Sequence, residues 1–334
     1  MKYSKKTTGA IFGTIMGLLL AWILLRSSAG EDGVSSAISN ILQRTAGVDI
    51  YLLGGGFALF LASQVLRALR WMLLSFRRSC RFSLSMAVTS IHVGLGHLLP
   101  FRLCDVAFVG LFRHFGEVPV GHGTASVFFA KLLDLMAMGV VIGSAVAAGA
   151  GDLAWVAPLL MAVGFAGIVF MSPVIRAFGP PARWVLAKLV PGGGARWFDD
   201  LLDASSVEGR RVKLTLAFLV SIFVWIAKLS MFVFLLAALG VTGIPHWKIF
   251  LASGVTNIIL ALPIHGLLSI GTTEAGWTAA FAMVGVEGSL VMNFDIVETG
   301  FSVHILWMLM AVVLMILALP LLVWDSKRKR KRID

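Results

Sequence analysis

The chain has 334 residues, of which 58% are hydrophobic and 13% are charged, and its formal net charge is +11. A soluble domain normally carries about 25% charged residues, so the composition indicates an integral membrane protein and excludes an ordinary soluble enzyme. The longest polar stretch, residues 172–213, falls short of the roughly 50 residues of a small domain, and we therefore expect no separate aqueous catalytic domain.

Many of the basic residues flank apolar segments, at residues 77–81, 113–114 and 327–332. Loops rich in Lys and Arg stay on the cytoplasmic side, and the last of these clusters also suits the anionic inner leaflet of a membrane. The positive charge therefore predicts topology, with both termini in the cytoplasm, rather than binding to nucleic acid.

In chain order, apolar runs of about 20 residues predict six spanning helices. Arg26 directly follows the first run, and that run nearly spans a bilayer, which favours a retained helix over a cleaved signal peptide. The six runs cover roughly residues 9–25, 50–75, 124–149, 153–171, 214–240 and 300–324.

Two further apolar segments, residues 84–112 and 249–286, are each broken near the middle by proline, glycine and polar residues. Backbone that leaves a helix at membrane depth must be buried in protein or line a wet cavity. We expect each segment to form a re-entrant helical hairpin, shaped by Pro100 in the first and by Pro263 and Gly271 in the second. The alternative is a pair of ordinary kinked spanning helices in each segment.

The charge bias places both ends of the first broken segment in the cytoplasm, so the second must enter from the outside to leave the basic tail inside. Residues 50–149 and 214–324 then form two repeat-like units of opposite orientation, as in many secondary transporters. We predict an all-α polytopic membrane protein with about six spanning helices, two opposed re-entrant helical hairpins and an inverted-repeat architecture. It forms a single membrane domain over residues 1–326, followed by a basic cytoplasmic tail at residues 327–334.

The cytoplasmic loop at residues 172–213 alternates apolar bulk with charge, which is typical of short helices lying on a membrane surface. Its acidic cluster, Asp199, Asp200 and Asp203, could be a metal site, but a solvated helix face explains it better.

No other pattern predicts a metal or a cofactor. Cys80 lies among arginines and Cys104 lies inside a broken apolar segment, a spacing that favours neither a disulfide nor a metal site. The chain has no Gly-x-x-x-x-Gly-Lys-[Ser/Thr] phosphate-binding loop. Any transport would therefore be downhill or coupled to an ion.

Lys228 lies near the middle of an apolar run, about 20 Å of helix from either end, so its side chain cannot reach a headgroup. A lysine at the bilayer centre costs about 3 kcal/mol, and intramembrane charges are functional candidates by default. The alternative is a structural ion pair.

Lys131 and Asp134 lie on one face of their helix. They could neutralise each other, or Asp134 could orient Lys131 toward a phosphate-bearing ligand. Arg67 and Arg70 also share a face, near the cytoplasmic end of theirs, where snorkelling to the surface explains Arg70 and leaves the role of Arg67 open.

In the first hairpin, Arg102 and Asp105 fall in the first two turns of the returning helix if that helix begins at Pro100. A helix N-terminus at membrane depth, with an arginine beside it, suits an anionic headgroup. In the second hairpin, His265 could titrate near neutral pH, although a lone histidine is more often structural.

Glu274 falls in the first turn of the second returning helix, which Thr272 or Thr273 can cap. Its carboxylate could pair with Lys228, carry a proton, or serve only in capping and packing.

Three of these segments together resemble the transmembrane, flippase-like domain of the lysylphosphatidylglycerol synthase/flippase family. Residues 99–105 look like the family's Pro-x-Arg-x-Gly-acidic hairpin, and residues 131–134 look like its basic-x-x-Asp helix. Residues 262–275 are similar to its Pro-rich, Gly-x-x-Glu hairpin. The chain departs from the family pattern where Cys104 replaces a glycine, where Phe108 stands for an arginine, and where residues 130–131 are Ala-Lys instead of Glu-Arg.

The resemblance implies a stand-alone, multi-pass protein of the bacterial plasma membrane, without the aminoacyl-transferring soluble domain of some relatives. We expect a lipid flippase or transporter that moves or binds an anionic or modified lipid, of phospholipid, polyprenyl or hopanoid type, at a midplane site. Its expected substrate-binding residues are Arg102, Asp105, Lys131, Asp134, Lys228, His265 and Glu274, with no catalytic residue, metal or cofactor.

Two alternatives stay open. One is an intramembrane lipid-modifying transferase that uses Asp105 or Glu274 as a general base. The other is a non-catalytic scaffold of a lipid-synthesis complex, acting through the loop at residues 172–213.

Overall fold

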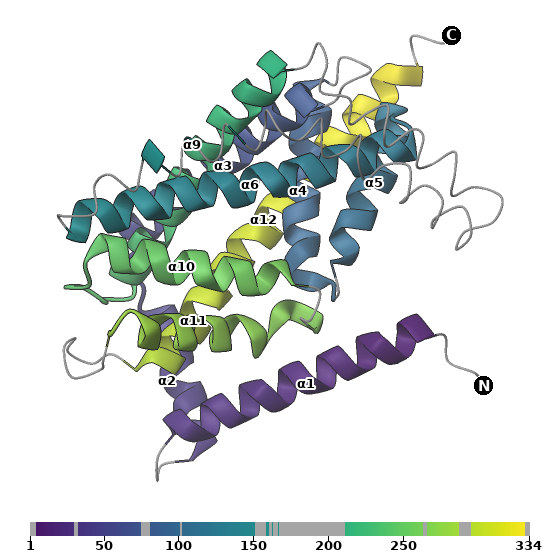
Figure 1. Ribbon diagram of the computed structural model, residues 1–334. Helices are drawn as coiled ribbons and strands as arrows, with labels where there is room; N and C mark the ends of the chain where they lie inside the picture. The colour runs from purple at the N-terminus through teal and green to yellow at the C-terminus, as the bar shows by residue number, and fades with distance from the viewer. Residues whose placement is uncertain are drawn as a thin grey trace.

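A computed structural model describes most of the chain, and every regular element in its described residues is a helix (Figure 1). This confirms the prediction of an all-α polytopic membrane protein. Most of the predicted span at 153–171 and most of the loop at 172–213, including its acidic cluster, lie outside the described residues. The described residues are 5–29, 33–74, 81–100, 102–150, 158, 159, 162, 166, 211–262, 266–286 and 295–330.

Four of the described helices are long and apolar enough to cross a membrane. They agree with four of the predicted spans, although α6 and α12 begin four residues earlier than expected. They are α3 (Ile50–Leu74), α6 (Val120–Ala150), α9 (Arg211–Ala238) and α12 (Ile296–Arg330).

The two broken segments each form a pair of helices that pack against each other (Figure 1). The first pair is α4 (Phe82–Leu98) and α5 (Leu103–Gly116). The second is α10 (His246–Ala261) and α11 (Thr272–Met283), with the short 3-10 turn η1 (Leu267–Ser269) between them.

The arms of these hairpins are too short to cross a bilayer. They contain 17, 14, 16 and 12 residues, which corresponds to about 18 to 25 Å of helix. A bilayer's hydrocarbon core is about 30 Å thick. The lengths therefore favour helical hairpins over pairs of kinked spanning helices.

The helices of the two predicted units pack in corresponding ways. Helix α3 runs antiparallel to α9: the Asp49 N–H donates to the Ala238 carbonyl at one end (3.0 Å), and Arg70 Nη1 donates to Ser221 Oγ near the other (3.0 Å). Helix α4 of the first hairpin packs on α12, and helix α10 of the second hairpin packs on α6. Each hairpin thus contacts the last long helix of the other unit, as expected of an inverted repeat.

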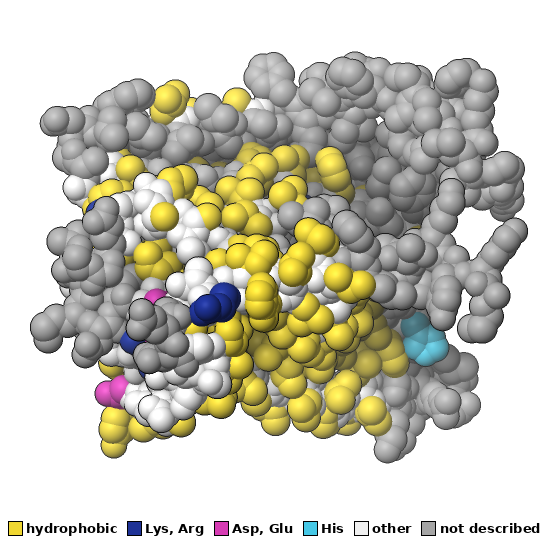
Figure 2. Space-filling model, turned by 90° about the horizontal axis from the view of Figure 1, so that it is seen from below, with side chains coloured by type: hydrophobic (Ala, Val, Ile, Leu, Met, Phe, Trp, Pro, Cys, Tyr) yellow, Lys and Arg dark blue, Asp and Glu magenta, His cyan; other side chains and the backbone are white. Residues whose placement is uncertain are grey.

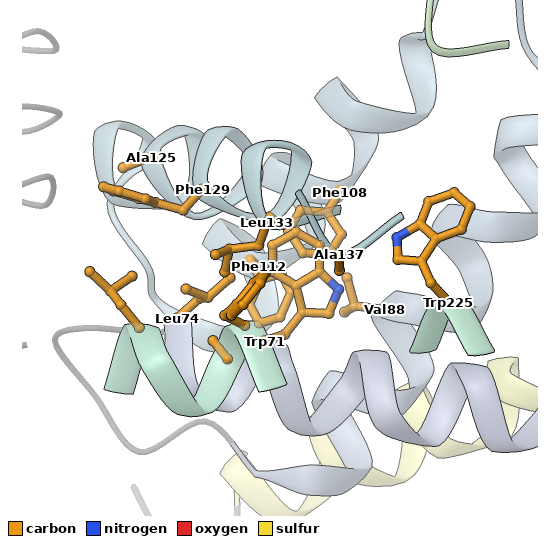
Figure 3. Close-up of a cluster of buried hydrophobic side chains, with 14 of the residues drawn as sticks. Trp71, Leu74, Val88, Phe108, Phe112, Ala125, Phe129, Leu133, Ala137 and Trp225 are labelled. Atoms are coloured by element: carbon orange, nitrogen blue, oxygen red, sulfur yellow. The ribbon is translucent and has the colours of Figure 1, made fainter. Parts of the chain in front are cut away.

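Two hydrophobic clusters hold the hairpins. In the first, Trp71 of α3 meets Phe108 of α5 with ring centroids 4.2 Å apart, and Phe112 lies 4.7 Å beyond (Figure 3). In the second, Trp277 of α11 lies 5.2 Å from Phe232 of α9, edge to face. Aromatic pairs in this range of distances add to the stabilisation from burial alone, so each cluster fixes one returning helix against a long helix.

Helix α1 (Lys5–Ser28) packs along the tip of the second hairpin. Gly13, Gly17 and Ala21 recur every four residues and are buried, and a Cβ on Gly17 would lie 2.7 Å from the Ile270 carbonyl oxygen. Small residues at this spacing let membrane helices approach closely. The opposite side of α1 exposes large apolar side chains such as Trp22, and hydrophobic residues cover much of the described surface in Figure 2.

Helix α2 (Val34–Ala46) was not predicted. It buries Ala37 and Ile41 and packs against α12 and α1. The three- and four-residue spacing of its apolar side chains is the ordinary signal of an amphipathic helix. A search for apolar runs of about 20 residues overlooks it, because it has only 13 residues.

Candidate functional site

A cavity of about 490 Å³ lies where the two hairpin tips meet, and both predicted units contribute to its wall. Helices α3, α4, α5 and α6 supply residues from the first unit, and α9, α10, η1 and α12 supply residues from the second. Its wall is unusually rich in ionisable side chains for a site among apolar helices. They are Arg67, His92, His97, Arg102, Cys104, Asp105, Lys131, Asp134 and Lys228.

Arg102 shapes the tip of the first hairpin. Its backbone is left-handed, with φ of 57°, and α5 begins at Leu103, three residues later than a start at Pro100 would give. Arg102 therefore precedes the first turn instead of lying in it. Its guanidinium donates a hydrogen bond to the Leu260 carbonyl on α10, so it joins the two hairpins.

Asp105 lies in the first turn of α5 and faces two partners. Its Oδ1 is 2.8 Å from His92 Nε2 on α4 and 3.2 Å from Lys131 Nζ on α6. Lys131 therefore pairs with Asp105 across the helix interface rather than with Asp134 on its own helix.

Asp134 is held by Arg70 and Trp225. Arg70 Nη1 and Nη2 donate to its two carboxylate oxygens at 2.5 and 3.2 Å, and Trp225 Nε1 donates at 2.9 Å. The expectation that Arg70 snorkels to the surface is wrong, because its side chain is buried and only 2% exposed. The guanidinium does not need to reach water because Asp134 on α6 neutralises it in a bidentate pair.

Lys228 has a polar and aromatic surrounding. Its Nζ donates to Asn257 Oδ1 at 2.5 Å and lies 4.9 Å from the ring centroid of Trp225 and 5.0 Å from that of Trp307. Cation–π contacts of this kind stabilise a desolvated ammonium. Within the described residues, no carboxylate lies within ion-pair distance of Lys228.

Arg67 projects from α3 into the same cavity. Among the described residues its side chain makes no hydrogen bond or ion pair, and its Nε is buried without a partner. A buried charge without a partner of opposite charge is unfavourable. An anionic ligand in the cavity would supply that partner to the Arg67 guanidinium.

The charges around the cavity do not balance within the described chain. Four cationic side chains line it, Arg70 lies just behind Asp134, and the only carboxylates in the described wall are Asp105 and Asp134. With the histidines counted as neutral and every lysine and arginine as protonated, this leaves a formal excess of three positive charges. The site is therefore suited to an anion, and a phosphate-bearing group matches the arginine and lysine donors best.

Glu274 does not line this cavity. Its side chain is 1% exposed, one oxygen accepts the Gly271 N–H at 2.6 Å, and the other lies 2.6 Å from His304 Nδ1. Of the roles considered for Glu274, capping is therefore observed, and its ionisable partner is His304 instead of Lys228. Gly271 has φ of 81° and makes the expected bend before α11, whereas Thr273 donates back to the Ser269 carbonyl.

Pro263 and His265 lie outside the described residues. Sequence reasoning missed His92, Asn257, Trp225, Trp307 and His304. The two histidines carried a usable signal, since a titratable side chain inside an apolar run is the reason for singling out Lys228. No local spacing indicates Asn257 or the two tryptophans. These three residues surround Lys228 but belong to three different helices, α10, α9 and α12.

Comparison with known proteins supports the resemblance in these motifs. Searches of curated proteins and of solved structures gave no match. The family model described as the lysylphosphatidylglycerol synthase TM region matches residues 9–297, which include both hairpins and every residue of the cavity wall except Trp307. The chain therefore belongs to the lysylphosphatidylglycerol synthase transmembrane-region family, whose members have a membrane lipid-related function.

Proposed function

We propose that this protein binds the anionic headgroup of a lipid in the cavity between its hairpins and moves that lipid between the leaflets of the bacterial plasma membrane. The observation that carries the proposal is the excess of positive charge around the cavity. An excess of positive charge inside a membrane protein is energetically unfavourable unless an anion balances it.

Three cations are the main headgroup ligands in this proposal: Arg67, Arg102 and Lys228. None of them has a carboxylate partner within ion-pair distance among the described residues. Lys131 shares its charge with Asp105, so it serves as a secondary ligand, and Asp134 keeps Arg70 and Trp225 in place.

The ligands come from both predicted units. Arg67, Arg102 and Lys131 belong to the first unit, and Lys228 and Asn257 belong to the second. In transporters built from inverted repeats, one unit rocks against the other around such a shared site. The same motion here would open the cavity to one leaflet and then to the other, with both termini on the cytoplasmic side.

The shared chemistry of the lipids expected for this family is a phosphate group attached to a long apolar tail. An anionic phospholipid and a polyprenyl phosphate both present it, and a phosphate-bearing hopanoid would as well. The arginine and lysine donors select the phosphate, while the apolar outer surface of the helices accepts the tail.

The proposal is tested with purified protein in liposomes that contain a labelled phosphatidylglycerol in one leaflet and, in parallel, a labelled phosphatidylcholine. We expect the protein to speed transbilayer movement of the anionic lipid, and we expect Lys228→Ala to slow it at least about tenfold, which corresponds to the loss of about 1.4 kcal/mol of headgroup binding. Gly139→Ala is the matched control, because a methyl group on Gly139 meets nothing within 4 Å. Equal rates in protein-containing and protein-free liposomes would contradict the proposal.

A lipid-modifying transferase is the second candidate, and one observation favours it. His92 and Asp105 form a close pair that faces the cavity, and a histidine held by a carboxylate is a common general base. Lipid extracts decide between the two: a deletion strain that lacks a modified lipid altogether indicates a transferase, whereas the same lipid held in the wrong leaflet indicates a transporter.

A further inference from the structure

A second ionisable cluster lies beyond the cavity wall, at the contact between α11 and α12. Glu274 and His304 meet there at 2.6 Å, and their side chains are 1% and 3% exposed. A carboxylate oxygen and an imidazole nitrogen at this distance share one proton in a short hydrogen bond. The pair is therefore a buried group that can hold a proton.

The pair is connected to the cavity through a second histidine. His304 Nε2 is buried and has no hydrogen-bond partner within the described residues. The ring centroid of His97 on α4 lies 6.0 Å from that of His304, and His97 lines the cavity. His97 and His304 are thus two neighbouring imidazoles between the cavity and Glu274.

Glu274 also caps the N-terminus of α11, the returning helix of the second hairpin. Its other oxygen accepts the N–H of Gly271, at the N-terminus of α11, where the helix dipole favours a negative charge. Gly271 in turn packs against the backbone of Gly17 on α1, since a Cβ placed on it would lie 1.9 Å from the Gly17 oxygen. The carboxylate of Glu274 is therefore linked through Gly271 to the contact between the hairpin tip and α1.

Other charged groups near the pair already have partners or lie apart from it. On α12, Glu298 pairs with Arg44 and accepts a hydrogen bond from Asn40 of α2. On α9, Lys228 bonds Asn257 and lies 5.0 Å from the ring centroid of Trp307, a ring that also contacts His97.

The other elements that pack against α11 carry their charged residues away from Glu274, near the helix ends. Helix α10 carries His246 and Lys248 at its first turn, and Lys248 bonds the Gly285 carbonyl beyond the far end of α11. Helix α1 carries Lys5 and Lys6 at one end and Arg26 at the other. Glu274 is the only charged residue of α11, and η1 has none.

We propose that His97, His304 and Glu274 form a proton relay through which the second hairpin couples headgroup movement to the movement of one proton. This inference rests on the proposed function. A proton from cavity water binds a ring nitrogen of His97, passes to His304 Nε2, and releases the Nδ1 proton to the Glu274 carboxylate. Only N–H and O–H bonds form and break, and the reverse sequence releases the proton after the hairpin moves.

The relay is tested by the leaflet distribution of a labelled phosphatidylglycerol in proteoliposomes at steady state, with a gradient of one pH unit and the membrane potential held at zero. The movement of one proton together with one singly charged headgroup is electroneutral. The pH gradient alone therefore sets the ratio of labelled lipid between the two leaflets, and we expect the wild-type protein to drive this ratio toward about tenfold per pH unit, which corresponds to about 1.4 kcal/mol. Protein-free liposomes give the background ratio.

Two variants and a control isolate the relay. Glu274→Gln removes the carboxyl group but keeps an oxygen for the Gly271 N–H, and His304→Gln leaves the capping contact of Glu274 intact. We expect a ratio near one with both, and the wild-type ratio with Glu298→Gln, which changes a buried carboxylate of α12 outside the relay.

A ratio near one for the wild-type protein, reached by rapid movement between the leaflets, would overturn the relay and leave the proposed function standing. A wild-type ratio retained in both relay variants would also overturn the relay. No movement of the lipid by the wild-type protein would overturn the proposed function, and the relay with it.

Discussion

At the scale of single residues, the cations at the cavity divide into those that form an ion pair and those that do not. Arg70 and Asp134 are a bidentate pair buried between α3 and α6, and Trp225 and Ser221 satisfy further polar atoms. Of the cations in the described cavity wall, Arg67, Arg102 and Lys228 have no carboxylate within ion-pair distance. The first group holds helices together, and the second leaves charge available to a ligand.

Asp134→Asn tests the pair of Arg70 and Asp134. It leaves the Arg70 guanidinium charged and buried, and breaking a buried ion pair by removing one partner costs about 3–5 kcal/mol. We expect a large drop in the thermal unfolding temperature of the detergent-solubilised protein.

The matched control for this prediction is Asp105→Asn, whose partner Lys131 is 40% exposed and can reach water in the cavity. The double variant Arg70→Met, Asp134→Leu removes both charges and should recover most of the lost stability. An Asp134→Asn protein that is as stable as the wild type would show that the pair contributes little.

The sequence predicted most of the charged residues of the cavity but not their partners. Lys131 and Asp134 share a helix face, which suggested that they interact, yet Lys131 turns to Asp105 and Asp134 turns to Arg70. These partners come from other helices, 26 and 64 positions away in the chain. Local spacing identifies which side chains share one face of a helix. It does not identify the side chains of the neighbouring helix that contact this face.

At the scale of elements, the broken hairpins and α1 depend on close backbone approach. Gly271 combines a φ of 81° with contact to the Gly17 backbone. Alanine at this position is strained in its backbone and has no space for its methyl group. The same pattern of small residues that lets α1 approach the hairpin tip therefore makes the tip intolerant of a side chain.

Gly271→Ala should destabilise the protein by more than about 1 kcal/mol, since the substitution is incompatible with the native backbone. The measurement is thermal unfolding in detergent, with Gly139→Ala as the matched control. Gly139 lies within α6 with open space around it, so alanine there should be neutral or stabilising by about 0.5–1 kcal/mol. Equal unfolding temperatures for the two variants would show that α1 does not pack on the tip as described.

The sequence predicted both hairpins because proline and glycine interrupt long apolar runs. It did not predict α2, since this helix is short and only one of its faces is apolar. It also misplaced the start of α5, because the left-handed conformation of Arg102 ends the turn and no sequence rule favours it at an arginine.

At the scale of the whole molecule, α3 and α9 run antiparallel, and each hairpin packs on the last long helix of the other unit. Charge bias and apolar length predict two units of opposite orientation. They could not predict which helices touch, because packing depends on shape matching between residues far apart in the chain, as for Gly94 against Met315 or Gly254 against Ile142.

Cysteine labelling tests the topology. Tyr51 at the start of α3 is 88% exposed and Val212 at the start of α9 is 73% exposed, and we expect them on opposite sides of the membrane if the basic loop before α9 is cytoplasmic. In a background of Cys80→Ser and Cys104→Ala, a membrane-impermeant thiol reagent should label Tyr51→Cys from the outside only and Val212→Cys from the cytoplasmic side only. Labelling of Tyr51→Cys from the cytoplasm would reverse the orientation.

The central claim is that the cavity between the hairpins binds a phosphate-bearing lipid headgroup through cations without carboxylate partners. Its most direct test is native mass spectrometry of the purified protein in an equimolar mixture of phosphatidylglycerol and phosphatidylcholine. We expect the wild-type protein to retain phosphatidylglycerol preferentially and the Arg67→Met, Lys228→Met double variant to lose that preference. Equal retention of the two lipids by the wild-type protein, or an unchanged preference in the double variant, would contradict the account.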